Sequence, residues 1–188
     1  MARLPLRPLV SSAAAVLRCR ALKSPAKLSL LVALLVLLPL SHLDIERSEG
    51  GWLLRVDGRP VDLAGELSER YTRLTRDCRP VQDLAAQDPM RAAVTQAIAQ
   101  YSPPDSLSAR LVQVSHQGPW YLAQVKFDHL QDAVVLLTRS PQGLAIAEDA
   151  VWSASTFPHK PEPVIRRYLQ AKAPAAPRAL IDCFAHPL

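Results

Sequence analysis

Residues Leu28–Leu43 read LSLLVALLVLLPLSHL, the longest apolar run in the chain, and they carry no formal charge. As a helix, this run would rise about 24 Å at ~1.5 Å per residue. The hydrocarbon core of a bilayer is about 30 Å thick, but the long side chains of Lys23 and Lys27 can extend the span by reaching the interface. We therefore expect a transmembrane anchor at 28–43, between an N-terminal tail (1–27) and a folded domain.

The charges on the two sides of this run are unequal. Six basic residues precede it, whereas all 17 acidic residues of the chain follow it. Basic residues that flank a span stay on the cytoplasmic side. The pattern predicts a bacterial inner-membrane protein with a cytoplasmic N-terminus and a periplasmic C-terminal domain. The net charge of +5 comes from the tail, so the domain lacks the basic face that nucleic-acid binding requires.

Three other interpretations of this N-terminal region remain open. The run could be the core of a cleaved secretory signal, although no Ala-x-Ala site follows it. The acid-free tail, rich in Arg, Ala and Ser, also has the composition of an organellar transit peptide, but Pro5, Pro8 and Pro25 interrupt it. A buried core helix is the third alternative, and the one-sided charge argues against it.

Two helices are expected early in the domain. They follow a polar tether at 44–51, a strand at 52–56 and an Asp57-Gly58 turn. The first helix, at 62–77, begins at the N-cap Asp62. Its apolar stripe consists of Leu63, Leu67, Tyr71, Leu74 and Cys78. The second helix begins at Asp88-Pro89 and ends near Ser102.

The charged face of the first helix is expected to be solvated. Glu66 stands four residues before Arg70, and Glu69 stands four residues before Arg73. Pairs in this order stabilise an exposed helix.

After residue 106 the apolar periodicity changes to two. Strands are expected at 107–116, 120–127, 133–138 and 144–156, with a bulge at Glu148 and Asp149. Their short connections favour antiparallel pairing. A third helix at 164–172 and an apolar segment at 178–184 follow. This order predicts an α+β domain at 52–188, with helices packed on an antiparallel sheet and the outline of cystatin-like or NTF2-like folds. No residue motif matches a known family.

Cysteine usage depends on the predicted topology. Cys19 precedes the anchor, whereas Cys78 and Cys183 follow it, in an oxidising compartment. We therefore predict a Cys78–Cys183 disulfide. The alternative is that Cys183 is a nucleophile assisted by Asp182 and His186.

No pattern in the sequence identifies catalytic, metal-binding or cofactor-binding residues. The histidines lack metal-site spacing, and no phosphate-binding glycine loop occurs. Asp128, His129 and Asp132 cluster between two strands, where aspartate is also a common turn residue. The best binding candidates are the aromatic residues Trp120, Tyr121 and Trp152, which could line a pocket or a partner site.

These observations lead to two hypotheses about function. The first is a non-catalytic, single-pass membrane protein that contacts lipid through its anchor and whose outer domain binds a partner protein or joins an envelope assembly. The second is a small-ligand-binding or hydrolytic domain that uses a helix-on-sheet cavity. A deep pocket with an acid or a histidine favours the second hypothesis, whereas a filled sheet favours the first.

Overall fold

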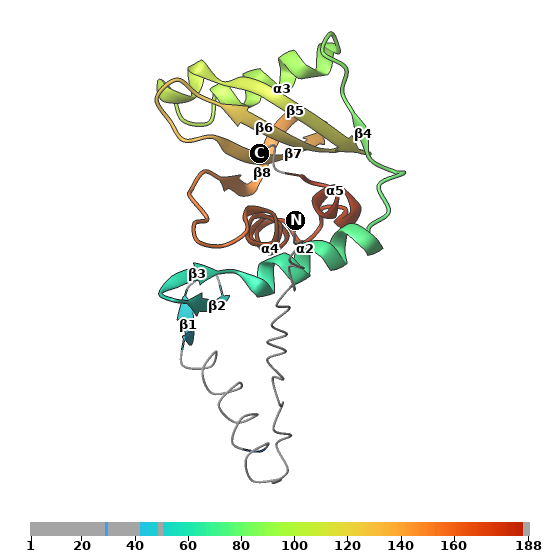
Figure 1. Cartoon of the computed structure of the whole chain (residues 1–188). Coiled ribbons are helices and arrows are strands. Elements are labelled where there is room, and N and C mark those ends of the chain that lie inside the picture. The colour runs from blue at the N-terminus through green and yellow to red at the C-terminus, as the bar shows by residue number, and fades with distance from the viewer. Residues whose placement is uncertain (1–28, 30–41, 49–50, 186–188) are drawn as a thin grey trace, which may run out of the picture. The chain divides into compact units, whose positions relative to one another are not determined.

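The computed structural model describes residues 29, 42–48 and 51–185 (Figure 1). A compact unit begins at His42. Most of the predicted anchor lies outside the described residues, and its last residue, Leu43, is the first residue of strand β1 (Leu43–Ser48). Among the helices in the described ranges, none is long and apolar enough to cross a membrane.

A three-stranded antiparallel sheet opens the domain, in the order β1, β2 (Gly51–Val56), β3 (Arg59–Val61). The residues expected to form a tether therefore form β1 and the start of β2. The segment is a strand because its side chains pair across the ladder: Ile45 lies opposite Leu54, and Glu46 forms an ion pair with Arg55. The turn prediction is confirmed, since Asp57 and Gly58 both have the positive φ of a type I′ turn.

A five-stranded antiparallel sheet forms the centre of the domain. Its strands are β4 (Gln82–Asp83), β5 (Arg110–Gln117), β6 (Trp120–Lys126), β7 (Ala133–Ser140) and β8 (Gly143–Trp152), paired in that order. The four long strands confirm the change of periodicity. The start of the first predicted strand is instead a short 3-10 helix, η1 (Asp105–Ser108). The bulge in β8 is present, because Glu148 and Asp149 have positive φ and the pairing with β7 shifts there.

Helices cover both faces of this sheet. Helix α3 (Pro89–Ala99) packs on one face, where Val94 and Ile98 contact the residues around Tyr121 and Ala123. Helices α4 (Pro161–Lys172) and α5 (Arg178–Asp182) cover the other face, where Ile165 and Leu180 contact the residues around Leu122. Because side chains along β6 point alternately to the two faces, this strand contributes residues to the core clusters on both sides of the sheet.

Helix α2 (Leu63–Thr75) packs against α4, on the side away from the five-stranded sheet (Figure 1). Its N-cap is the predicted one, since Asp62 accepts a hydrogen bond from the Gly65 amide at 2.8 Å. Cys78, beyond its C-terminal end, forms a disulfide with Cys183, and the two Cα atoms are 5.7 Å apart. The predicted pairing is therefore confirmed, and it leaves no thiol at Cys183 to act as a nucleophile.

Candidate functional site

Helix α2 has the opposite orientation to the one its sequence suggests. The side chains of its apolar stripe face solvent: Leu67 is 67% exposed, Tyr71 69% and Leu74 86%. Glu69, on the charged side, is only 4% exposed. The prediction that the charged face is solvated is therefore wrong at Glu69, and the leucines of α2 are a surface feature.

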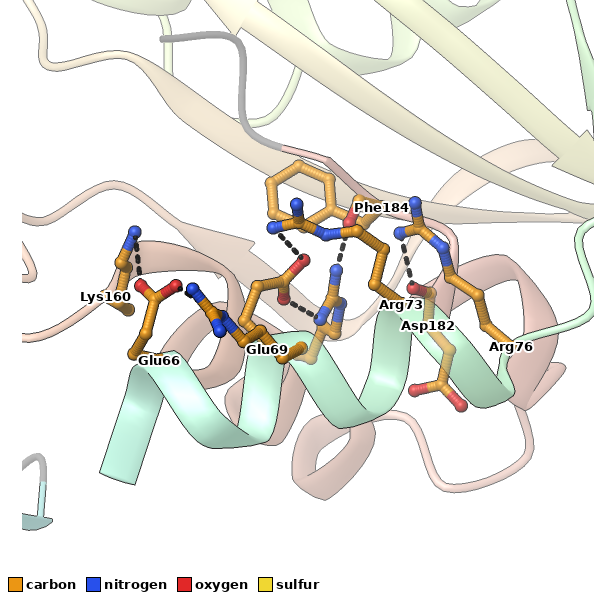
Figure 2. A network of polar contacts seen from close by, with 9 residues as sticks. Glu66, Glu69, Arg73, Arg76, Lys160, Asp182 and Phe184 are labelled. Atoms are coloured by element: carbon orange, nitrogen blue, oxygen red, sulfur yellow. Dashed lines mark hydrogen bonds and ion pairs between the residues drawn. The ribbon is translucent and has the colours of Figure 1, made fainter. Parts of the chain in front are cut away.

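A buried arginine explains this orientation. Arg166 of α4 donates hydrogen bonds from one guanidinium nitrogen to Glu69 and from another to the Phe184 carbonyl. Arg73, one turn after Glu69 in α2, lies 3.5 Å from the other Glu69 oxygen (Figure 2). An unpaired buried charge costs several kcal/mol, about 3–5 when one partner of a pair is removed. Because Arg166 is 6% exposed, α2 must turn an acid toward it.

The same side of α2 makes further polar contacts along its length (Figure 2). Near its start, Lys160 Nζ lies 3.0 Å from Glu66 Oε2, and near its end Arg76 donates to the Asp182 carbonyl. The hydrogen bond from Lys160 lowers the pKa of Glu66, and Glu66 in turn raises the pKa of Lys160. These contacts fix α2 by its polar side and leave the opposite side unoccupied among the described residues.

A second polar cluster joins three distant parts of the chain. Ser48 ends β1, Asp62 caps α2, and His159 lies in the turn before α4. Ser48 Oγ is within hydrogen-bond distance of His159 Nε2, and His159 Nδ1 lies 3.5 Å from Asp62 Oδ2. The side chains of His159 and Asp62 are only 7% and 8% exposed. A serine, a histidine and an acid in this atomic order resemble a nucleophile, a base and an orienting group.

Two observations about this cluster point in different directions. A cavity of about 630 Å³ borders Ser48 and His159 and is also lined by Trp152, Phe157 and Tyr168, which leaves room for a ligand. However, both Asp62 oxygens already accept hydrogen bonds, from the backbone amides of Gly65 and Lys160. Asp62 therefore has a structural role that joins α2 to the turn before α4.

The predicted binding residues Trp120, Tyr121 and Trp152 do not form one surface. Tyr121 is 6% exposed and packs beneath α3. Trp120 and Trp152 are half-buried on the opposite side of the sheet, against the cluster formed with α4 and α5. Trp152 alone borders the cavity next to His159. Binding by these aromatics stays a prediction.

The acidic loop between β6 and β7 forms surface ion pairs. Asp128 pairs with Arg110, and Asp132 lies 3.8 Å from Lys126. In the part of the chain that the structure describes, no group of three His, Cys, Asp or Glu side chains has the geometry of a metal site. His186, the third member of the alternative cysteine site, lies outside the described residues.

Sequence reasoning missed Ser48, Asp62 and His159 as a group. Ser48 and His159 are 111 positions apart in the sequence, and no known spacing pattern relates the three residues. The one usable signal was Asp62, which was identified as a helix cap. Comparisons with protein-family models, with curated proteins and with solved structures gave no match.

Proposed function

We propose that this protein is a non-catalytic, single-pass membrane protein whose extracytoplasmic domain binds a partner protein, as a subunit of an assembly in a bacterial envelope. The observation that carries this proposal is the exposed apolar stripe of α2, from Leu67 to Leu74. Isolated exposed leucines are ordinary, but an apolar row on one helix that is fixed by its polar side marks an interaction surface. Helices cover both faces of the central sheet, which also favours binding at the outside of the domain.

The anchor is supported by the apolar run and its one-sided charge. A reporter enzyme such as alkaline phosphatase, fused at the C-terminus, should be active only when the domain is outside the cytoplasm. Washing the membrane fraction with carbonate should leave the full-length chain in the pellet. A chain that is recovered in the soluble fraction with its first residue intact contradicts the anchor.

The partner site can be tested by photo-crosslinking in cells. A benzophenone amino acid at Tyr71 should give a discrete crosslinked product, and Leu67→Ser with Leu74→Ser should abolish it. Leu107 is a matched control position, because it is 66% exposed but lies in η1, on another part of the domain. Equal crosslinking from positions 71 and 107, or a product that survives the serine substitutions, contradicts a partner on α2.

A second candidate function is favoured by the Ser48–His159–Asp62 cluster. A hydrolase would use Ser48 as nucleophile and His159 as general base, with Asp62 orienting the imidazole. Ser48 Oγ would attack an ester carbonyl carbon while His159 takes the hydroxyl proton, which then leaves with the alcohol. Water, losing a proton to His159, would release the acid and restore the serine hydroxyl.

A fluorophosphonate probe tests this second candidate directly, because it forms a stable bond with an activated serine. Labelling of the wild-type chain that is lost in Ser48→Ala and retained in Ser155→Ala supports a hydrolase. Ser155 lines the same cavity, so it controls for a change in the shape of the pocket. Absence of labelling in the wild-type protein leaves the cluster as a structural contact.

A further inference from the structure

We propose that the outward face of the β1–β2–β3 sheet rests on the headgroup region of an anionic bilayer. This inference depends on the membrane anchor of the proposed function and adds the orientation of the domain against the lipid. Its ligand is the lipid surface itself: phosphate groups for the basic side chains and the upper acyl region for the apolar ones.

The strand register separates two unlike faces of this sheet. Residues directly opposite each other in a ladder point to the same face, and the residues along a strand alternate. One face carries Leu43, Ile45, Arg47, Trp52, Leu54, Val56, Arg59 and Val61. Ile45 is 68% exposed and Trp52 58%, so this face is open to solvent among the described residues. The domain leaves a mostly apolar sheet face uncovered directly after the predicted anchor.

The apolar face of these strands carries basic residues but no acid. Its charged residues are Arg47 and Arg59, whereas the acids Asp44 and Glu46 lie on the other face together with Arg55, which forms an ion pair with Glu46. Arg47 lies over the Trp52 ring, with its guanidinium carbon 5.7 Å from the ring centre. Tryptophan is enriched at the headgroup level, and basic side chains are attracted to an anionic lipid surface. This combination fits anionic lipid better than it fits a basic or a neutral protein surface.

The position of this sheet in the sequence, directly after the predicted anchor, favours lipid as the molecule that its apolar face contacts. β1 begins at Leu43, where the apolar run ends. Consecutive Cα atoms are about 3.8 Å apart, so a run that leaves the bilayer at Ser41 or His42 places β1 at the membrane surface. His42 Nδ1 lies 2.7 Å from Asp57 Oδ1 of the β2–β3 turn, within hydrogen-bond distance. Along the sequence, no polar linker separates the predicted run from β1.

Quenching of tryptophan fluorescence by brominated lipids tests the contact. The full-length chain is reconstituted in vesicles of phosphatidylcholine and phosphatidylglycerol (3:1), with or without bromine at acyl positions 6 and 7. We expect the brominated vesicles to quench part of the emission, and Trp52→Phe to remove that quenched part. Trp120→Phe is the matched control, because Trp120 is half-buried against the core cluster beneath α4 and α5, and this variant should retain the quenching.

A charge-reversal pair tests the role of the arginines. Arg47→Glu with Arg59→Glu should reduce the quenching to the value seen in vesicles of phosphatidylcholine alone. Arg139→Glu, a charge reversal at another exposed position, on the β7–β8 hairpin, should leave the quenching unchanged.

The two proposals fail in different ways. Vesicles that carry the chain on flotation but do not quench Trp52 overturn the lipid contact and leave the anchor standing. A chain that does not float with vesicles overturns the anchor and this inference with it. A benzophenone at Ile45 that crosslinks two copies of the chain assigns this face to a dimer instead, which also overturns the lipid contact.

Discussion

Helices α2 and α3 have the same sequence pattern, but they bury opposite sides of that pattern. Each begins at an aspartate N-cap and carries one apolar stripe. In α3 the stripe is buried, with Val94 fully covered and Ile98 2% exposed. In α2 the stripe faces solvent and the buried residue is Glu69.

The difference lies in what each helix packs against. α3 covers an apolar sheet face, so burying its own apolar residues removes the most surface from water. α2 covers α4, where the buried Arg166 requires an acid. The periodicity of the sequence therefore identifies the apolar side of a helix, but the element that packs against the helix determines whether that side is buried. In α2 the outcome is that Leu67 and Leu74 remain exposed, and the proposed partner site rests on this exposure.

The largest effect should come from removing the disulfide. Cys78 and Cys183 are 105 residues apart, and the loop-entropy model gives such a bond about 4–5 kcal/mol of stability. Replacing both cysteines by serine should lower the free energy of unfolding by that amount, measured by urea denaturation in detergent. Hydrogen exchange should then accelerate more in α2 than in α3, because the bond holds the chain just after α2. Equal acceleration of exchange in both helices would contradict the claim that the disulfide holds α2 more than α3.

Replacing Arg166 by alanine should destabilise the protein by about 3–5 kcal/mol, since Glu69 would stay buried without its buried partner and with only the exposed Arg73 beside it. Arg70→Ala is the control, because Arg70 pairs with Glu66 at the surface, where such a pair contributes under about 1 kcal/mol. A double change, Glu69→Leu with Arg166→Met, should recover most of the loss, because no charge is left unpaired. A double variant as unstable as Arg166→Ala would mean that packing, rather than charge, orients α2.

Matched truncations in the two stripes compare the helices directly. Ile98→Ala should cost about 2–5 kcal/mol, as deletions in a packed core do. Leu74→Ala should change the free energy of unfolding by less than about 0.5 kcal/mol, since its side chain is 86% exposed. Both values come from the same denaturation experiment. A large loss at Leu74 in the purified protein would show that the stripe is already occupied within this chain.

The smallest effect is a pH dependence at the start of α2. The pKa of Glu66 is lowered in the folded state, mainly by Lys160, so its contribution is complete above the ordinary glutamate pKa of about 4.3. That contribution is lost as the pH falls through the lower, folded-state pKa. The difference in Tm between wild type and Glu66→Gln should therefore shrink between pH 6 and pH 3. In a Lys160→Met background the difference should be small at both pH values, and a difference that grows on acidification contradicts the pairing.

Local signals in the sequence predicted much of this fold. Asp62 and Asp88 act as helix caps within three residues of the amides they bind, so the caps can be predicted without tertiary information. Period-two alternation identified β6, and the disulfide followed because only two cysteines lie beyond the apolar run.

The features that were missed depend on distant residues. The burial of Glu69 is decided by Arg166, which is 97 residues away. The Ser48–His159 contact joins positions that no short pattern connects, and β1 was missed because its polar residues are stabilised by pairing with β2. The candidate sites are thus less predictable than the elements, because they form where separate elements meet.

The disulfide divides the molecule mechanically. Between Cys78 and Cys183 the backbone forms a covalently closed ring that contains α3, the whole five-stranded sheet and α4. The segment 42–77 is outside this ring, and its contacts with the ring include those of Asp62, Glu69 and Arg76. A force applied through the N-terminal side would peel off the hairpin and α2, extend the chain by up to about 120 Å at ~3.4 Å per residue, and stop at the ring. Under tension from the N-terminal side, segment 42–77 could therefore extend by a limited length, whereas the part between Cys78 and Cys183 could not be extended while the disulfide is intact.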